Sequence, residues 1–129
     1  MFNLAWWFCY TLAAADPGAT PLIDFGAETL PEFVVLHDTS VERVPHQAGF
    51  ARRVRFEKVD WPNMFFQAPG AGWDWSNHSG VAVSLFNPEA HPVDVAMRVD
   101  NAGADGMNHC NTAQGAAPPG ESYVLRLYF

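Results

Sequence analysis

The strongest structural signal in the chain lies in the stretch Trp73-Asp74-Trp75-Ser76-Asn77-His78-Ser79-Gly80-Val81-Ala82-Val83-Ser84-Leu85-Phe86-Asn87-Pro88. Val81, Val83 and Leu85 alternate with the side chains between them, so they share one face of the segment. This period of two is typical of a strand with one face on a core. Ser76 and Asn77 favour a turn ahead of this strand, because their side chains hydrogen-bond to nearby backbone. Pro88 ends the strand, since proline donates no ladder hydrogen bond.

The same alternation recurs on both sides of this stretch. Strands are expected over 22–26, 33–36, 40–44, 50–58, 63–68, 92–100 and 121–129, and a polar loop over 101–119. No stretch keeps apolar residues at helical spacing for more than a turn or two. Short strands separated by turn signals predict an all-β protein, an antiparallel β-sandwich. A jelly roll (galactose-binding-like) is the favoured topology, while spacing alone leaves an immunoglobulin-like sandwich open.

The chain of 129 residues has room for one domain, which we expect over residues 20–129. Residues 1–15 form an apolar run without charge that ends in Ala13-Ala14-Ala15, a small-residue pattern typical of signal-peptide cleavage. The run is too short for a membrane span, which needs about 20 residues. We therefore expect a signal peptide or its remnant, and a secreted or periplasmic protein. Because no Lys or Arg precedes the run, an N-terminal strand packed on the domain is the alternative.

The net charge of −7, with only 7 Lys and Arg in the chain, limits the class of partner. Nucleic acids and anionic membranes are bound chiefly through cationic side chains, so neither is expected as a partner. An uncharged partner, such as a neutral polysaccharide or another protein, is compatible with this charge.

No catalytic constellation can be assembled from the sequence, which has no nucleophile elbow, phosphate loop or dinucleotide fingerprint. The carboxylates that could form a glycosidase pair all lie in predicted turns or at strand ends, where solvated acids are normal: Asp60, Asp74, Glu89, Asp100, Asp105 and Glu121. We expect no catalytic residue in this segment. Cys9 and Cys110 lack the spacing of a metal site, and Cys110 is expected to be a buried, inert thiol.

The chain concentrates aromatic residues in one region: Trp61, Phe65, Trp73 and Trp75. Aromatic rings stack on the apolar C–H faces of sugars while polar neighbours bind the hydroxyl groups. Phe65 is the most informative, because its neighbours Met64 and Phe66 are expected on the inward face. These four rings are candidate sugar platforms, and the candidate hydrogen-bonding partners are Asp74, Asn77, His78 and Asn108. The alternative is that the tryptophans plug the end of the sandwich core.

Oxygen-bearing side chains lie close together in the predicted loop. Asp100, Asn101 and Asp105 could hold a hard cation such as Ca²⁺, which takes oxygen ligands. Their spacing does not match an EF-hand, and tight turns also favour Asp, Asn and Gly. No cofactor is therefore required, and a structural Ca²⁺ is the candidate that stays open.

Several short blocks, taken in order, resemble one known family. They are Asp24-Phe25, Trp73-Asp74-Trp75-Ser76, Asn87-Pro88, Met97-Arg98-Val99-Asp100-Asn101-Ala102-Gly103-Ala104-Asp105-Gly106, His109-Cys110 and Pro119-Gly120-Glu121 with the strand after it. Over about residues 20–129 the sequence resembles the N-terminal carbohydrate-binding-module-like domain of β-agarases and related exo-acting glycoside hydrolases.

The resemblance implies a jelly roll that precedes a TIM-barrel catalytic domain, in a secreted enzyme acting on a galactan-type polysaccharide such as agarose. The catalytic residues of that family lie in the barrel, so none is carried over to this chain. Gly26 stands where an acidic residue commonly follows Asp-Phe in the family. This departure counts against a calcium site that includes Asp24.

Three functions follow as hypotheses. The first is a non-catalytic carbohydrate-binding module that tethers a catalytic domain in cis to neutral polysaccharide and raises the local substrate concentration. The second is a structural sandwich that braces the catalytic barrel without binding sugar. The third, a free-standing secreted binding protein, requires the natural chain to end at Phe129.

Overall fold

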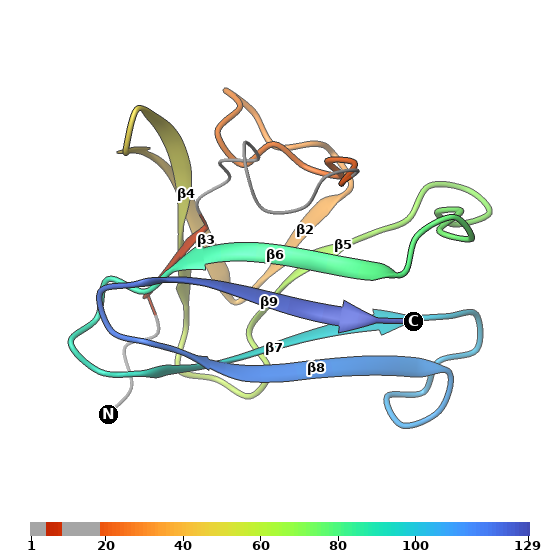
Figure 1. Cartoon of the computed structure of the whole chain (residues 1–129). Helices are drawn as coiled ribbons and strands as arrows, with labels where there is room; N and C mark the ends of the chain where they lie inside the picture. The colour runs from red at the N-terminus through yellow and green to blue at the C-terminus, as the bar shows by residue number, and fades with distance from the viewer. Residues whose placement is uncertain (1–4, 9–18) are drawn as a thin grey trace. The chain divides into compact units, whose positions relative to one another are not determined.

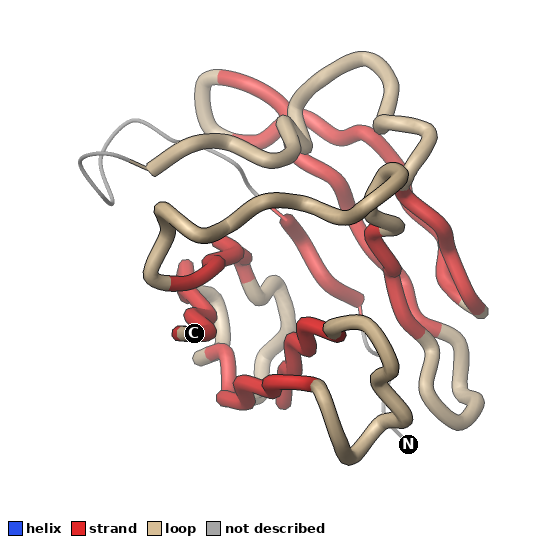
Figure 2. The backbone as a smooth tube through the Cα atoms, turned by 90° about the vertical axis from the view of Figure 1, so that its right-hand side faces the viewer, coloured by secondary structure: helices blue, strands red, loops and turns tan. Residues whose placement is uncertain are grey.

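The computed structural model describes the backbone of residues 5–8 and the whole of residues 19–129. Within these residues every regular element is a β-strand, and Figure 1 and Figure 2 show no helix there. The chain divides into two compact units, Met1–Trp73 (unit 1) and Asp74–Phe129 (unit 2). The predicted fold class, an all-β antiparallel protein of the β-sandwich class, is confirmed at this level, whereas the jelly-roll topology stays a prediction. No helix among the described residues is long and apolar enough to cross a membrane.

Unit 1 holds β1 (Ala5–Phe8), β2 (Val34–His37), β3 (Thr39–His46), β4 (Gly49–Phe56) and β5 (Asn63–Phe66). β3 and β4 form an antiparallel hairpin, and β1 pairs antiparallel with β4. β2 and β5 form a separate antiparallel ladder. The strands predicted between residues 33 and 68 are therefore confirmed, with small shifts at their ends.

The prediction of a signal peptide over 1–15 stays a prediction. Only Ala5–Phe8 of this segment is described, as the backbone of β1. Residues 1–4 and 9–18, which include Cys9 and the Ala13-Ala14-Ala15 run, lie outside the described residues.

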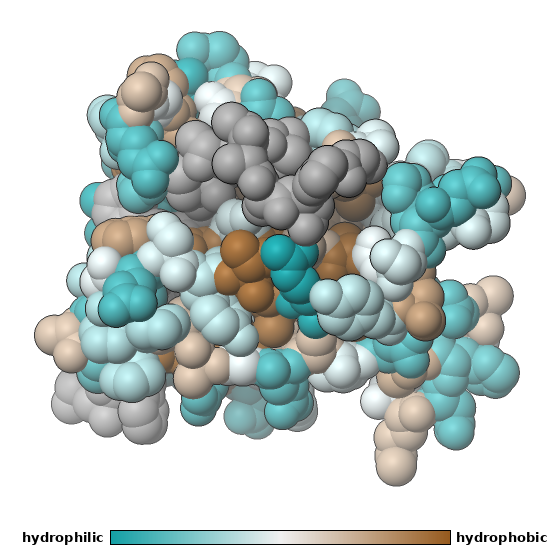
Figure 3. Space-filling model, viewed as in Figure 1, coloured by the Kyte–Doolittle hydropathy of each residue, from teal (hydrophilic) through white to brown (hydrophobic). Residues whose placement is uncertain are grey.

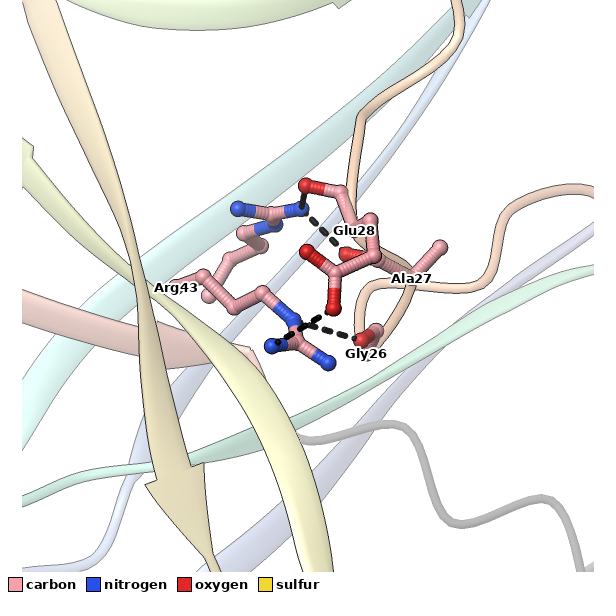
Figure 4. A network of polar contacts seen from close by, with 5 residues as sticks. Gly26, Ala27, Glu28 and Arg43 are labelled. Atoms are coloured by element: carbon pink, nitrogen blue, oxygen red, sulfur yellow. Dashed lines mark hydrogen bonds and ion pairs between the residues drawn. The ribbon is translucent and has the colours of Figure 1, made fainter.

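A buried guanidinium organises the loop ahead of β2. Arg52 on β4 is 7% exposed and lies opposite Arg43 on β3. Nη2 of Arg52 donates to the carbonyl oxygens of Ala27 and Glu28. Nε of Arg43 donates to the carbonyl oxygen of Gly26 at 2.9 Å, as Figure 4 shows. Burial first, and then the charge of Arg43, lower the pKa of Arg52 below its ordinary value. The loop carbonyls therefore serve the two arginines and not a strand ladder.

The strand predicted over 22–26 is wrong for this reason. The segment consists of bends and turns, and Oδ1 of Asp24 accepts the backbone N–H of Gly26 at 2.8 Å. Ile23 and Phe25 are nevertheless buried, at 7% and 5% exposure. The apolar alternation thus predicted burial correctly, but the backbone hydrogen bonds are local at Asp24 and run to Arg43 at Gly26, with none to another strand among those that the structure describes.

Unit 2 holds β6 (Gly80–Phe86), β7 (Val93–Asp100), β8 (Cys110–Ala117) and β9 (Ser122–Tyr128). β6 pairs antiparallel with β9, and β7 pairs antiparallel with β8. β9 also lies against β7 and β8. The strands predicted over 81–86, 92–100 and 121–129 are confirmed. The buried apolar side chains of this unit are Leu85, Val93, Val95, Ala117, Leu125 and Leu127.

The polar loop predicted over 101–119 is wrong for residues 110–117, which form β8. This segment lacks the alternation of a typical strand, and its pairing with β7 makes it one. Gly115 gave a loop signal in the sequence. In the structure a Cβ atom at this position would collide with the hydroxyl group of Tyr123 on β9, so glycine permits a close approach here.

Asn87, directly after β6, is 1% exposed and joins separate segments of unit 2. Its Nδ2 donates to the carbonyl oxygens of His91 and Ala117, each at 2.9 Å. Its Oδ1 accepts the N–H of Glu89 at 2.9 Å. A buried polar side chain is tolerated when its donors and acceptors are used in this way, and the amide fixes the ends of two strands.

Replacing Asn87 with Ala should lower the free energy of unfolding by about 3 kcal/mol, because it leaves two carbonyl groups and one amide without their partner. Asn87→Asp should lose as much or more at neutral pH, since a carboxylate would then face two carbonyl oxygens. Urea denaturation of the full chain, followed by circular dichroism, measures the loss. Asn111→Ala, at an exposed position on β8, is the control and should change the free energy by less than about 0.5 kcal/mol. Equal, small effects of the two Ala variants would contradict the network.

Candidate functional site

The β2–β5 ladder of unit 1 has an inward and an outward side. Phe66 contacts the buried Phe25, with ring centroids 6.4 Å apart, so its side of the ladder faces the core. Phe65 points the opposite way by strand alternation, pairs with Val35 and is 45% exposed. The prediction that Phe65 points outward between half-buried Met64 and Phe66 is confirmed.

Trp61, in the connection that leads into β5, is 89% exposed. Its backbone has a φ of 60°, in the left-handed region, which costs a residue with a side chain about 1–2 kcal/mol. Nδ2 of Asn63 donates to the carbonyl oxygen of Trp61 at 2.9 Å and supports this conformation. The alternative that the tryptophans plug the core is therefore wrong for Trp61.

Trp73, at the end of unit 1, is half-buried. Its ring meets the ring of Phe33 edge-on, with centroids 5.6 Å apart and planes at 77°. The carbonyl oxygen of Phe33 accepts the N–H of Gln67 at 2.8 Å, which extends the β2–β5 ladder. Trp73 therefore contributes to packing within unit 1 and exposes only part of its ring.

In unit 2, Trp75 is also half-buried, and its ring stacks on that of Phe129. The centroids are 5.4 Å apart and the planes differ by 13°. Phe129 remains 51% exposed, and its N–H donates to the carbonyl oxygen of Ser79 at 3.0 Å. We call this pair the Trp75–Phe129 stack.

The turn ahead of β6 carries polar residues on both sides of Trp75 in the sequence. Oδ1 of Asp74 accepts the N–H of Ser76 at 3.0 Å, and the N–H of His78 donates to the carbonyl oxygen of Trp75 at 2.9 Å. Hydrogen bonds from the side chain and then the backbone of Ser76 lower the pKa of Asp74, so its carboxylate is ionised at neutral pH. Asn77 and His78 are exposed, and Figure 3 shows hydrophilic residues where the connection ahead of β6 projects at the upper right.

The β7–β8 connection is held by its own carboxylates. Oδ1 of Asp105 accepts the N–H groups of Met107 and Asn108 at 2.9 and 2.7 Å, and its Oδ2 accepts from Nδ2 of Asn108 at 2.7 Å. Oδ1 of Asp100 pairs with Nε of Arg98 at 2.7 Å. In the part of the chain that the structure describes, no three His, Cys, Asp or Glu residues are grouped to hold a metal ion. Turn formation explains Asp105, and a Ca²⁺ ion at Asp24, Asp100, Asn101 and Asp105 stays a prediction.

Sequence analysis missed the rings that contact the two half-buried tryptophans. Phe33 and Phe129 lie far from Trp73 and Trp75 in the sequence, so no local pattern reveals these contacts. It also missed Met107, which is 89% exposed in the β7–β8 connection. Cys110, expected to be buried, is half-buried.

The predicted site residues fall in both units. Unit 1 contains Trp61, Phe65 and Trp73, and unit 2 contains Asp74, Trp75, Asn77, His78 and Asn108. Comparison with known proteins finds no matching family model, no matching curated protein and no matching solved structure. Function must therefore be argued from the side chains that each unit exposes.

Trp61→Asn should raise the free energy of unfolding by about 1 kcal/mol, because asparagine tolerates the left-handed backbone that costs tryptophan energy. The loss of the indole should not offset this gain, since the side chain is 89% exposed. Thermal and urea denaturation of the full chain measure the difference. Phe65→Asn, on the regular backbone of β5, is the control and should bring no gain. A Trp61→Asn variant that is less stable than the parent would show that the indole supports the fold.

The carboxylate of Asp105 should titrate at an unusually low pH. Hydrogen bonds from Asn108 and Met107 lower the pKa of this carboxyl from 3.8 to about 2. Since the folded-state pKa is depressed, its contribution to the β7–β8 connection is present above about pH 4 and is lost as the pH falls through about 2. Carboxyl ¹³C chemical shifts followed against pH measure the midpoint, and Asn108→Ala should move it upward. A midpoint near 4 in the parent chain would contradict these hydrogen bonds.

Proposed function

We propose that the chain is a non-catalytic carbohydrate-binding module of a secreted or periplasmic polysaccharide-degrading glycoside hydrolase, and that it binds neutral polysaccharide through Trp61 and Phe65. Agarose or another galactan is the substrate class that the sequence resemblance implies. The catalytic domain in cis would then act on polysaccharide that this chain holds nearby.

The observation that carries the proposal is the exposure of Trp61 on a left-handed backbone. A large apolar side chain in solvent adds little to the stability of the fold, and strained backbone tends to persist where a functional site needs it. Phe65 adds a second outward ring on the strand that follows. On the outward side of the same ladder, His37 and Asn63 pair across the strands and are exposed, so hydrogen-bonding groups accompany the rings.

A structural module that braces a catalytic domain is the second candidate. The observation in its favour is that Trp73 and Trp75 pack against rings of their own units, as they would in a domain whose tryptophans serve packing. In that role Trp61 and Phe65 would dock on a neighbouring domain, and sugar would not bind.

Affinity electrophoresis of the full chain distinguishes these functions. Migration should be retarded in gels containing agarose and not in gels containing dextran. Trp61→Ala and Phe65→Ala should each weaken binding about tenfold or more, because truncating a central aromatic contact typically costs above 1 kcal/mol, taken here as about 1.4 kcal/mol. Met107→Ala, which removes an equally exposed apolar side chain from unit 2, is the matched control and should bind like the parent. Uniform migration in every gel would overturn the proposal and favour the bracing role.

A further inference from the structure

We infer that unit 2 carries a second sugar-binding surface of its own, formed by the Trp75–Phe129 stack and the turn over residues 74–79. The inference rests on the proposed function for its ligand class, a neutral saccharide chain. It assigns a separate site, whose rings and polar groups all belong to unit 2.

The stack supplies an apolar wall. The two planes differ by only 13°, so one face of the Phe129 ring lies on Trp75. Phe129 as a residue remains 51% exposed. Tyr128, next to it, is 69% exposed. An aromatic face of this kind suits the apolar C–H face of a pyranose.

The turn supplies the polar groups. Its backbone is closed by the hydrogen bond from His78 to Trp75, and the hydrogen bond from Phe129 to Ser79 ties the second ring to the same turn. Rings and turn are therefore preorganised as one piece, which lowers the entropy that a ligand must remove on binding.

The charge of the turn selects the ligand. Asp74 is ionised at neutral pH, and the segment 74–79 contains no Lys or Arg. An anionic ligand would be repelled, whereas sugar hydroxyl groups donate readily to a carboxylate. Asn77 and His78 are exposed and offer a further amide and an imidazole. An ionised carboxylate in the same turn also opposes a purely apolar partner, because such a partner would remove water from the charge.

Titration of the ¹⁵N-labelled full chain with a neutral agaro-oligosaccharide tests this surface, with maltohexaose as the control ligand. The indole N–H signals of Trp75 and Trp61 should both move, each with its own saturation curve. Phe129→Ala should abolish the shift at Trp75 and leave that at Trp61. Asn77→Ala changes an exposed residue and leaves both rings in place. It should lower the affinity measured from the Trp75 signal severalfold.

The outcomes separate the two proposals. A shift at Trp61 with none at Trp75 would overturn the second surface and leave the proposed function standing. A shift at Trp75 alone, abolished in Phe129→Ala, would support the second surface and remove the role of Trp61. No shift at either indole would overturn both, and equal shifts with maltohexaose would overturn the ligand class.

Discussion

The arrangement of unit 1 depends on a charge that the fold has buried. Arg52 lies opposite Arg43, a pairing of like charges that destabilises a sheet unless other groups compensate it. The loop carbonyls of residues 26–28 and the carboxylate of Glu28, which pairs with Arg43 at 3.3 Å, provide that compensation and fix the loop over the hairpin. The same loop places Phe25 in the core, where it meets Phe66 on β5. Because Phe66 is directed inward, strand alternation directs Phe65 outward. The orientation of a candidate ligand contact on β5 is thus linked, through the loop and Phe25, to a buried guanidinium on the preceding strand, β4.

In unit 2 the connecting segments are held by a buried polar group that is neutral, the amide of Asn87. Asn87 lies where several irregular segments meet, and its amide matches two carbonyl acceptors and one N–H donor. An amide can both donate and accept, whereas a guanidinium only donates. Arg52 therefore suits a loop that offers it acceptors, the carbonyl oxygens of Ala27 and Glu28, and Asn87 suits a junction that presents both donors and acceptors. In each unit one buried polar side chain selects the path of the connecting segments, and apolar burial supplies the bulk of the stability.

The sequence predicted what local alternation determines. Strands β6, β7 and β9 and the outward direction of Phe65 follow from the pattern of side chains within a few residues. The turn over residues 22–26 could not be predicted, because it leads into the carbonyls of residues 26–28, which bond to arginines more than a dozen positions later. β8 was missed because its glycine suggested a loop. Gly115 instead leaves room for the side chain of Tyr123 from β9, a contact that the local sequence does not reveal. The same limit applies to the candidate site: Trp75 looked like Trp61 in the sequence, but only Trp75 has a ring stacked on it.

This difference between the two tryptophans bears on what each contributes. Trp75 gains stacking energy from Phe129, so its presence has a structural explanation even without a ligand. Trp61 has no comparable stacking partner among the described residues. Its side chain is in solvent, and its backbone is in a conformation that favours glycine or asparagine. Asp38, Gln47 and His109 adopt a similar φ, so what distinguishes Trp61 is the large apolar side chain that it leaves in solvent. The proposed binding of a sugar by the exposed indole would account for this side chain, so the proposed function depends most directly on Trp61.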